Sequence, residues 1–253
     1  MPFKPRGLNP VLTKGLDNFV QTQSFPDLYR AYAWKNDTYE NGFPDIYSLE
    51  SQLVMMDQTV GISLPDVDSV LKWGASPYHG RISGAQIVLP PRSLHTPEGT
   101  AVPALGDTPL VPLRALRQKI TRGIGPTYLS KVLRFGLPQE YGAIDTRLVR
   151  VFGQGDADAR RHHWIKLSAS KGRYGRWSIN EAQNAWPGEY ETWINILRYL
   201  ATRLGGDCPH PASFVRAGLR HEGVWECADL EMALFSYASQ RTYGPSQPVS
   251  CRR

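Results

Sequence analysis

Cysteine is scarce in this sequence: there are three in 253 residues, far apart at Cys208, Cys227 and Cys251. So few thiols exclude a disulfide framework and a four-thiolate metal site, and we expect plain thiols, no bound metal and no cofactor. Long hydrophobic runs are also lacking. No segment approaches the roughly 18 apolar residues of a membrane span, and residues 1–15 lack the apolar core of a secretory signal. These absences predict a cytoplasmic protein with no membrane partner.

Excess positive charge is concentrated in two segments. The chain carries 29 Lys and Arg against 23 Asp and Glu, a net charge of +6. Residues 114–150 contain eight cations and two acids, so this segment alone has the excess of the whole chain. Residues 160–177 contain six cations and no acid, interleaved with Trp164, Tyr174 and Trp177. Because cations neutralise phosphates and aromatic rings stack on bases, both segments are candidate nucleic-acid contacts. A solvated loop is the alternative for the second.

Periodicity predicts a mainly α-helical protein. Apolar residues at helical spacing predict helices over residues 45–60, 63–73, 113–121, 127–135, 146–152, 190–204 and 228–240. Ser63 and Asp66 form the pattern of a capping box. Residues 1–44, rich in proline, glycine, asparagine and aromatics, predict an irregular arm. Residues 74–109 predict a long loop with a short strand at 85–89, and residues 163–180 predict a β-hairpin.

The segment "GIGPTYLSKVLRFGLPQEYGAIDTRLVRVFG", residues 123–153, joins a tight glycine turn to two short helices. Gly123 and Gly125 permit positive φ angles and let another backbone come close. Pro126 suits the first turn of the next helix, whose free N–H groups favour an anion. We expect a phosphate there, although glycine turns often join helices without one. Asp145 stands at the N-cap of the second helix, where an aspartate is ordinarily only a cap.

The same segment resembles the helix-hairpin-helix DNA glycosylase superfamily, and most closely its 8-oxoguanine glycosylase branch. In that family a hairpin reading roughly Leu-Pro-Gly-Val-Gly precedes an aspartate in a segment such as Val-Asp-Thr-His. The matching residues here are 121–125 and 144–147. The resemblance implies a two-lobed, mainly α fold with its hairpin motif in residues 113–135, and Asp145 as the catalytic carboxylate. It implies DNA contacts from Arg122, Gly123, Ile124, Gly125, Arg147 and Arg150.

A second resemblance lies in "WECADLEMALFSYAS", residues 225–239, which is similar to the final helix of the 8-oxoguanine glycosylases. That helix supplies a glutamine and a phenylalanine to the base pocket, and the matching positions are Glu231 and Phe235. A surface acid and a core ring are the ordinary alternatives for these two residues. Further candidate pocket walls, with plain packing as their alternative, flank the long loop: Trp73, Tyr78 and His79.

Departures from the family change the chemistry that it implies. Bifunctional members carry a lysine two positions after the second hairpin glycine, where this chain has Thr127. Lys131 follows one turn later on the same face; a phosphate contact or a solvated amine is its ordinary interpretation, and an inward-facing nucleophile is the alternative. The iron–sulfur cysteines of the endonuclease III branch are absent. The resemblance thus implies a monofunctional enzyme in which water attacks the sugar and an abasic site remains.

We expect one lobe over residues 45–155 and a second built from 1–44 and 156–253, in a monomer that binds double-stranded DNA containing a modified base. A damaged base and a hypermodified base of phage DNA, such as glucosylated hydroxymethylcytosine removed in antiviral defence, both stay open as substrates. A non-catalytic helix-hairpin-helix DNA-binding module is the alternative from another class. Asp145 argues against it, because a pure DNA binder gains little from a carboxylate beside phosphates. The segments 74–109 and 160–177 extend a minimal member of the family and could widen its pocket.

Overall fold

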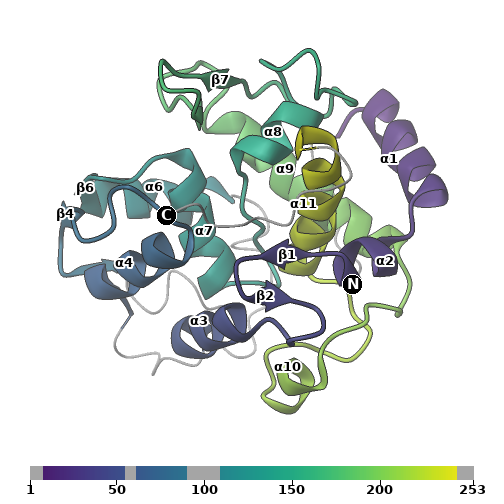
Figure 1. The fold of residues 1–253 in the computed structure, drawn as a ribbon, viewed down its shortest axis with the longest axis horizontal. Coiled ribbons are helices and arrows are strands. Elements are labelled where there is room, and N and C mark those ends of the chain that lie inside the picture. Colours follow the sequence, from purple (N-terminus) through teal and green to yellow (C-terminus); the bar gives the residue numbers. More distant parts are fainter. Residues whose placement is uncertain (1–7, 55–60, 90–108, 244–253) are drawn as a thin grey trace.

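Helices make up most of the regular structure in the computed structural model, which describes residues 8–54, 61–89 and 109–243 (Figure 1). The predicted mainly α fold class is therefore confirmed. The helices are α1 (Pro10–Thr22), α2 (Phe25–Arg30), α3 (Pro44–Val54), α4 (Leu64–Trp73), α6 (Leu110–Lys119), α7 (Pro126–Gly136), α8 (Thr146–Phe152), α9 (Gly188–Arg203), α10 (Ala212–Arg216) and α11 (Cys227–Tyr243).

Short antiparallel strand pairs join the helices. The predicted strand at 85–89 is present as β5, and the predicted hairpin at 163–180 is formed by β7 and β8. The described residues contain more strand pairs than the single hairpin we expected. The pairs are β1 (Ala33–Trp34) with β2 (Asp37–Thr38), β3 (Ile62–Ser63) with β5 (Ile87–Leu89), β4 (Ser83–Gly84) with β6 (Ile120–Arg122), and β7 (Ala169–Lys171) with β8 (Trp177–Ile179).

Two groups of helices pack around one continuous core. Helix α7 contacts α3, α4 and α6, whereas α11 contacts α2, α8 and α9 (Figure 1). Phe135 of α7, Trp193 of α9 and Phe235 of α11 belong to the same buried cluster, so the core crosses from one group to the other. Helix α8 packs on α11, although the predicted boundary near residue 155 put it with α7. The division into two lobes stays a prediction.

The irregular arm predicted at residues 1–44 is wrong in its described part, which contains α1 and α2. Asn9 Oδ1 accepts a hydrogen bond from the Leu12 N–H at 2.9 Å, and Pro10 occupies the first turn of α1. The asparagine and proline that suggested irregularity thus start a helix. Leu16 and Phe19 anchor α1 in the core.

Capping explains where two further helices begin. Asp37 Oδ1 accepts hydrogen bonds from the Asp45 and Ile46 N–H groups at 2.8 and 3.1 Å, which satisfies the first turn of α3. The capping box predicted at the start of α4 is present, since the Ser63 and Asp66 side chains accept hydrogen bonds from each other's backbone N–H groups.

Two predicted segments lie partly outside the described part of the chain: residues 55–60 of the predicted 45–60 helix, and residues 90–108 of the predicted loop.

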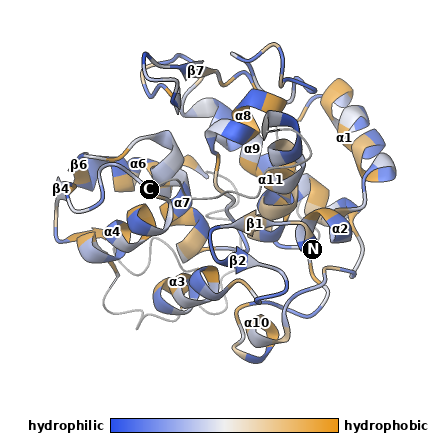
Figure 2. Cartoon of the chain, viewed as in Figure 1, coloured by the Kyte–Doolittle hydropathy of each residue, from blue (hydrophilic) through white to orange (hydrophobic). Residues whose placement is uncertain are grey.

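The helix surfaces are amphipathic. Figure 2 shows hydrophobic and hydrophilic residues sharing α1 and α4, as expected of helices with one face on the core. Among the residues described, no helix combines the length and apolarity needed to cross a bilayer.

Candidate active site

An open cleft and a small closed pocket meet at Asp145. The cleft has a volume of about 890 Å³, within the size range of ligand-binding sites. The pocket behind it encloses about 10 Å³, room for no more than one water molecule. Both cavities are lined by Trp34, Lys131 and Asp145. The candidate carboxylate therefore lies at the boundary between a groove open to solvent and a closed cavity.

Asp145 is the N-cap of α8, as predicted. Its Oδ1 accepts hydrogen bonds from the backbone N–H groups of Arg147 and Leu148 at 2.8 and 3.1 Å. Both bonds use one oxygen, and no residue in the described part of the chain donates to Oδ2. The cap fixes the carboxyl group of a residue that lines both cavities. This arrangement can stabilise a positive charge that develops beside it.

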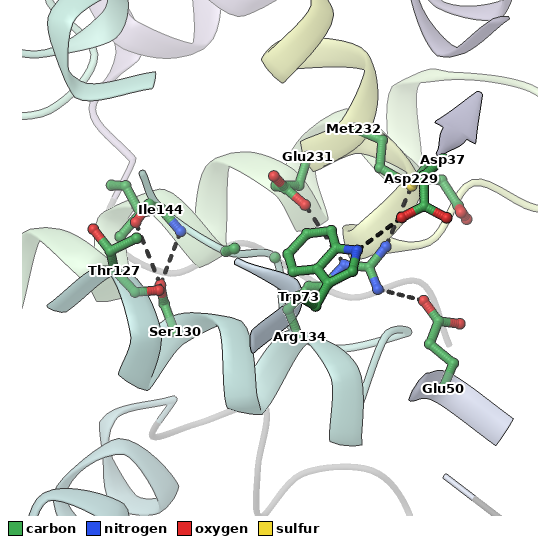
Figure 3. Close-up of polar contacts among 12 residues, drawn as sticks. Asp37, Glu50, Trp73, Thr127, Ser130, Arg134, Ile144, Asp229, Glu231 and Met232 are labelled. Atoms are coloured by element: carbon green, nitrogen blue, oxygen red, sulfur yellow. Dashed lines mark hydrogen bonds and ion pairs between the residues drawn. The ribbon is translucent and has the colours of Figure 1, made fainter. Parts of the chain in front are cut away.

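The backbone ahead of Asp145 is held from two helices. Ser130 of α7 accepts a hydrogen bond from the Ile144 N–H at 3.0 Å, and its own hydroxyl donates to the Thr127 carbonyl at 2.9 Å (Figure 3). From α9, the Tyr190 hydroxyl and the Trp193 indole N–H donate to the carbonyls of residues 142 and 143. These bonds position Asp145 relative to the first turn of α7.

Gly142 permits a close approach at this point. A Cβ atom there would lie 2.3 Å from Leu197 Cδ1 and 2.9 Å from Glu231 Cβ. A larger residue would therefore push the segment before Asp145 away from α9 and α11. The glycine in "YGAID" serves this packing, and its φ angle is not in the left-handed region.

Lys131 faces inward, so the interpretation as an exposed phosphate contact or solvated amine is wrong. Its side chain is buried, and its Nζ lies 4.9 Å from the ring centre of Trp73, 5.3 Å from that of Tyr128 and 5.6 Å from that of Trp34. Burial lowers the pKa of Lys131, while the carboxylates of Asp145 and Glu231 act in the opposite direction. The three rings stabilise the charged form by cation–π attraction.

Glu231 and Phe235 both line the closed pocket, so the surface interpretation of Glu231 is wrong. Burial raises the pKa of Glu231 to about 7, although Arg134 opposes this, with its Nε 3.6 Å from Glu231 Oε2. Arg134 is held from the far side by Glu50, whose Oε1 accepts at 2.5 Å (Figure 3). The floor of the pocket thus carries a carboxyl group that titrates near neutrality.

Aromatic rings form the walls of the closed pocket. Trp73 lines it as predicted and is held by its indole N–H, which donates to Asp37 Oδ2 at 2.7 Å (Figure 3). Trp34 packs against both Trp73 and Phe235, at ring-centre distances of 6.2 and 6.3 Å. Such walls suit a planar aromatic ligand.

Of the two glycines in the turn, Gly125 lines the cleft and Gly123 does not. Gly125 and Pro126 line the cleft at the start of α7, and no side chain caps this helix. Gly123 has φ +85°, as predicted, but a Cβ there would meet Ile82 Cγ2 at 2.9 Å, so it serves packing inside the protein. Gly125 does not use the positive φ that glycine permits: its φ is an extended −131°, and there is open space beside it. Only Gly125 leaves room for another backbone.

The other candidate DNA contacts divide by exposure. Arg122 is exposed on β6, whereas the Ile124 side chain is buried, leaving only backbone groups there. Arg147 is buried, with its guanidinium 4.7 Å from the Phe235 ring centre. Arg150 lines the cleft and donates to Asp156 Oδ2 at 2.6 Å.

Four further candidates lie in different surroundings. Thr127 is half-buried and lines the cleft, and Tyr78 lines the cleft but not the closed pocket. His79 lines neither cavity, and its Nδ1 lies 2.8 Å from Asp68 Oδ2. Trp164 of the basic segment is buried against Phe152, so it cannot stack on a nucleic acid. His79 is therefore no longer a candidate pocket wall, and Trp164 is no longer a candidate nucleic-acid contact.

Sequence reasoning missed Tyr32, Trp34 and Tyr128. The first two come from the arm predicted to be irregular, and Trp34 enters the site through the short β1 strand. Tyr128 directly follows Thr127 at the start of α7 and lines the cleft. The one available signal was the density of aromatic residues around 29–34 in the sequence.

One group outside the cleft has metal-ligand character. The ligand atoms of Cys208, His210 and Asp229 lie within 4.8 Å of one another. However, Arg220 Nε donates to both Asp229 oxygens at 3.0 and 3.2 Å, so this carboxylate is already neutralised. Cys208 and Cys227 are free thiols, as predicted, and Cys251 lies outside the described residues.

No protein-family model, curated protein or solved structure matches this chain. A proposal for its function therefore rests on the geometry of the site.

Proposed function

We propose that the protein is a DNA glycosylase that flips a modified base out of double-stranded DNA and releases it by hydrolysis. The observation that carries the proposal is the position of Asp145, whose half-buried carboxyl lines both the cleft and the closed aromatic pocket. The uncapped start of α7 lines the same cleft and suits a phosphate. A flipped nucleotide needs this combination of backbone grip, carboxylate and aromatic pocket.

The proposed reaction uses water as its nucleophile. The bond between C1′ and the base nitrogen breaks with its electron pair on the base, and the Asp145 carboxylate stabilises the cationic sugar. A water oxygen then bonds to C1′, and a water proton passes to the carboxylate. The released base takes a proton from solvent, and an abasic site remains. Asp145 acts here through charge that matters most in the transition state.

The closed pocket must open to admit a base. The closed pocket, with about 10 Å³ of free volume, has no room for a nucleobase. The adjoining cleft, at about 890 Å³, has enough room for one. Lys131 and Trp34 line both cavities, so we expect their side chains to move when a base enters. This requirement supports a substrate whose own ring replaces the lysine beside the aromatic walls, and it leaves damaged and hypermodified bases both open.

A second candidate chemistry follows from Lys131. A buried amine of lowered pKa beside Asp145 has the properties of a nucleophile that attacks C1′ itself. Base release would then produce a Schiff base and strand cleavage. The water mechanism is favoured because Thr127 occupies the nucleophile position of the resemblance and because three rings stabilise the ammonium form.

Base release from defined DNA tests the proposal. The full chain is incubated with duplexes that each carry one damaged base, and with phage genomes carrying hypermodified cytosine, and free bases are identified by mass spectrometry. We expect one class of base to be released by the wild type and not by Asp145→Asn. Binding of these DNAs without release of any base would support the non-catalytic binding module instead.

A further inference from the structure

A chain of buried ion pairs lies behind the closed pocket and begins and ends on α11. It runs through five side chains, each at most 9% exposed: Asp229, Arg220, Glu50, Arg134 and Glu231. Arg134 and Glu231 line the closed pocket, whereas the other three do not. Figure 3 shows Arg134 between Glu50 and Glu231. The pocket is thus joined by charge to residues outside it.

Arg134 is shared unequally between two carboxyl groups. Its Nη1 donates to Glu50 Oε1 at 2.5 Å, a short charge-assisted hydrogen bond. Its Nε lies 3.6 Å from Glu231 Oε2, which is longer than a hydrogen bond. Its Nη2 donates to the Met232 sulfur at 3.3 Å, a weak acceptor. The guanidinium is therefore held toward Glu50, and a movement of less than about 1 Å would complete a hydrogen bond to Glu231.

Glu50 is fixed from the other side by Arg220. Arg220 Nη1 donates to Glu50 Oε2 at 2.6 Å, and Nη2 donates to Oε1 at 3.0 Å. Glu50 lies on α3 and is fully buried, so this two-point contact leaves its carboxylate little freedom to follow Arg134. Because a buried cation needs an anionic partner, Arg134 stays with Glu50 as long as residue 50 is charged and within reach.

The groups that face Glu231 come from four segments of the chain. Burial of Glu231 is the largest effect and raises the pKa of its carboxyl. Arg134 and Lys131, both on α7, act against burial, whereas Asp145 acts with it. Two phenol groups stay neutral because burial raises their pKa: Tyr32, ahead of β1, and Tyr190, on α9. A closer Arg134 would shift this balance toward the ionised carboxylate.

We propose that Glu50 determines base specificity from outside the pocket: by holding Arg134 in an ion pair, it leaves the Glu231 carboxyl free to exchange hydrogen bonds with the flipped base. This inference rests on the proposed function. A free carboxyl group donates when protonated and accepts when ionised, whereas a carboxylate paired with arginine can only accept. Glu50 lines neither cavity, so it is a positioning residue that acts through Arg134.

The test follows Glu231 in the free protein, with no DNA present. The Glu231 carboxyl carbon is titrated by NMR of isotopically labelled glutamate, and Glu231→Gln identifies its signal. We expect Glu50→Gln to lower the titration midpoint by about one pH unit or more, because the released guanidinium closes on Glu231. Glu50→Asp keeps the charge but draws it back by one methylene group, so it should lower the midpoint in the same direction, and it serves alone if Glu50→Gln does not fold.

Two controls separate the effect of Arg134 from a general disturbance. Glu50→Gln combined with Arg134→Gln removes the cation together with its partner, so the midpoint should return at least to the wild-type value. Glu181→Gln breaks an ion pair with Arg117 that shares no residue with the chain of ion pairs, and it should change nothing. An unchanged midpoint in the Glu50 variants that fold, or a lowered one in the double variant, would overturn the inference.

Base release gives the functional measurement. In the Glu50 variants, the preference for bases that present a donor to Glu231 should appear at a lower pH than in the wild type, by the same shift as the midpoint. A shifted midpoint in a protein that releases no base would support the link between Glu50 and Glu231 and contradict the proposed function. Base release with an unshifted midpoint would support the proposed function and overturn the inference.

Discussion

Ser130 and Ile144 are joined by a hydrogen bond that links α7 to the residue before Asp145. The Ile144 N–H donates to Ser130 Oγ at 3.0 Å, and both residues are fully buried. The same hydroxyl bonds the Thr127 carbonyl in the first turn of α7. One serine therefore links the expected phosphate site to the proposed catalytic carboxylate.

Removing this hydroxyl should reduce catalysis more than binding. Ser130→Ala leaves the Ile144 N–H buried without a partner, which costs about 1–3 kcal/mol of unfolding free energy. We expect the melting temperature to fall by about 2–10 °C and single-turnover base release to slow at least tenfold, with unchanged DNA affinity. Ser236→Ala is the control, because this buried hydroxyl bonds only a carbonyl of its own helix. Equal rates in the two variants would contradict a positioning role for Ser130.

Asp145→Asn should keep the fold and lose the reaction. The amide oxygen of asparagine can still accept the two bonds that cap α8, so the helix start is retained. The negative charge is lost, and it is needed where the sugar becomes cationic. Base release should fall by several orders of magnitude while DNA affinity stays within about twofold. Asp158→Asn, an exposed acid on the loop after α8, serves as the control.

Sequence patterns predicted the parts of the site that local chemistry determines. The cap at Asp145, the glycine turn and the helix that carries Glu231 and Phe235 all lie within short segments whose residues set their own backbone. The inward direction of Lys131 was not predictable, because it depends on Trp34 and Trp73, which are distant in sequence. Trp34 lines the pocket only because tertiary packing brings its strand there.

Substrate preference should change with pH through Glu231. Its pKa of about 7 means that the carboxyl donates a hydrogen bond below pH 7 and only accepts above it. Raising the pH from 6 to 8 should therefore shift preference from bases that present an acceptor at this point toward bases that present a donor. The measurement is the ratio of release rates for two bases that differ in one exocyclic oxygen or amine.

In Glu231→Gln this ratio should become independent of pH, since an amide donates and accepts at every pH in the range. Glu222→Gln, an exposed acid before α11, should leave the wild-type ratio unchanged. A ratio that stays constant with pH in the wild type would remove Glu231 from base recognition.

Stability should decrease with rising pH because of Glu226. Its carboxyl oxygens are buried without a hydrogen-bond partner in the described residues, and burial raises its pKa from 4.5 to about 8. The folded state therefore binds more protons than the unfolded state between these values. The contribution of Glu226 to unfolding free energy is fully present below pH 4.5 and is lost as the pH rises through 8.

Glu226→Gln removes this titration. We expect its melting temperature to equal that of the wild type near pH 4.5 and to exceed it by about 3 °C or more at pH 8.5, measured by calorimetry. Arg220 retains Glu50 and Asp229 as partners in the variant, so the buried cation stays paired. A difference between the two proteins that does not vary with pH would show that Glu226 does not titrate in this range.

Borohydride trapping decides between water and Lys131 as the nucleophile. We expect no covalent protein–DNA adduct during turnover, with strand breaks only after alkali, because Thr127 cannot form a Schiff base and the rings around Lys131 stabilise its ammonium form. An adduct that disappears in Lys131→Ala and persists in Lys119→Ala would establish the lyase mechanism, since Lys119 is an exposed amine at the end of α6. With water as the nucleophile, Lys131→Ala should instead enlarge the closed pocket and broaden the range of bases released, because its side chain lines the pocket beside Trp34 and Trp73. The two mechanisms thus predict opposite results for one variant: loss of an adduct, or a wider substrate range with no adduct in either protein.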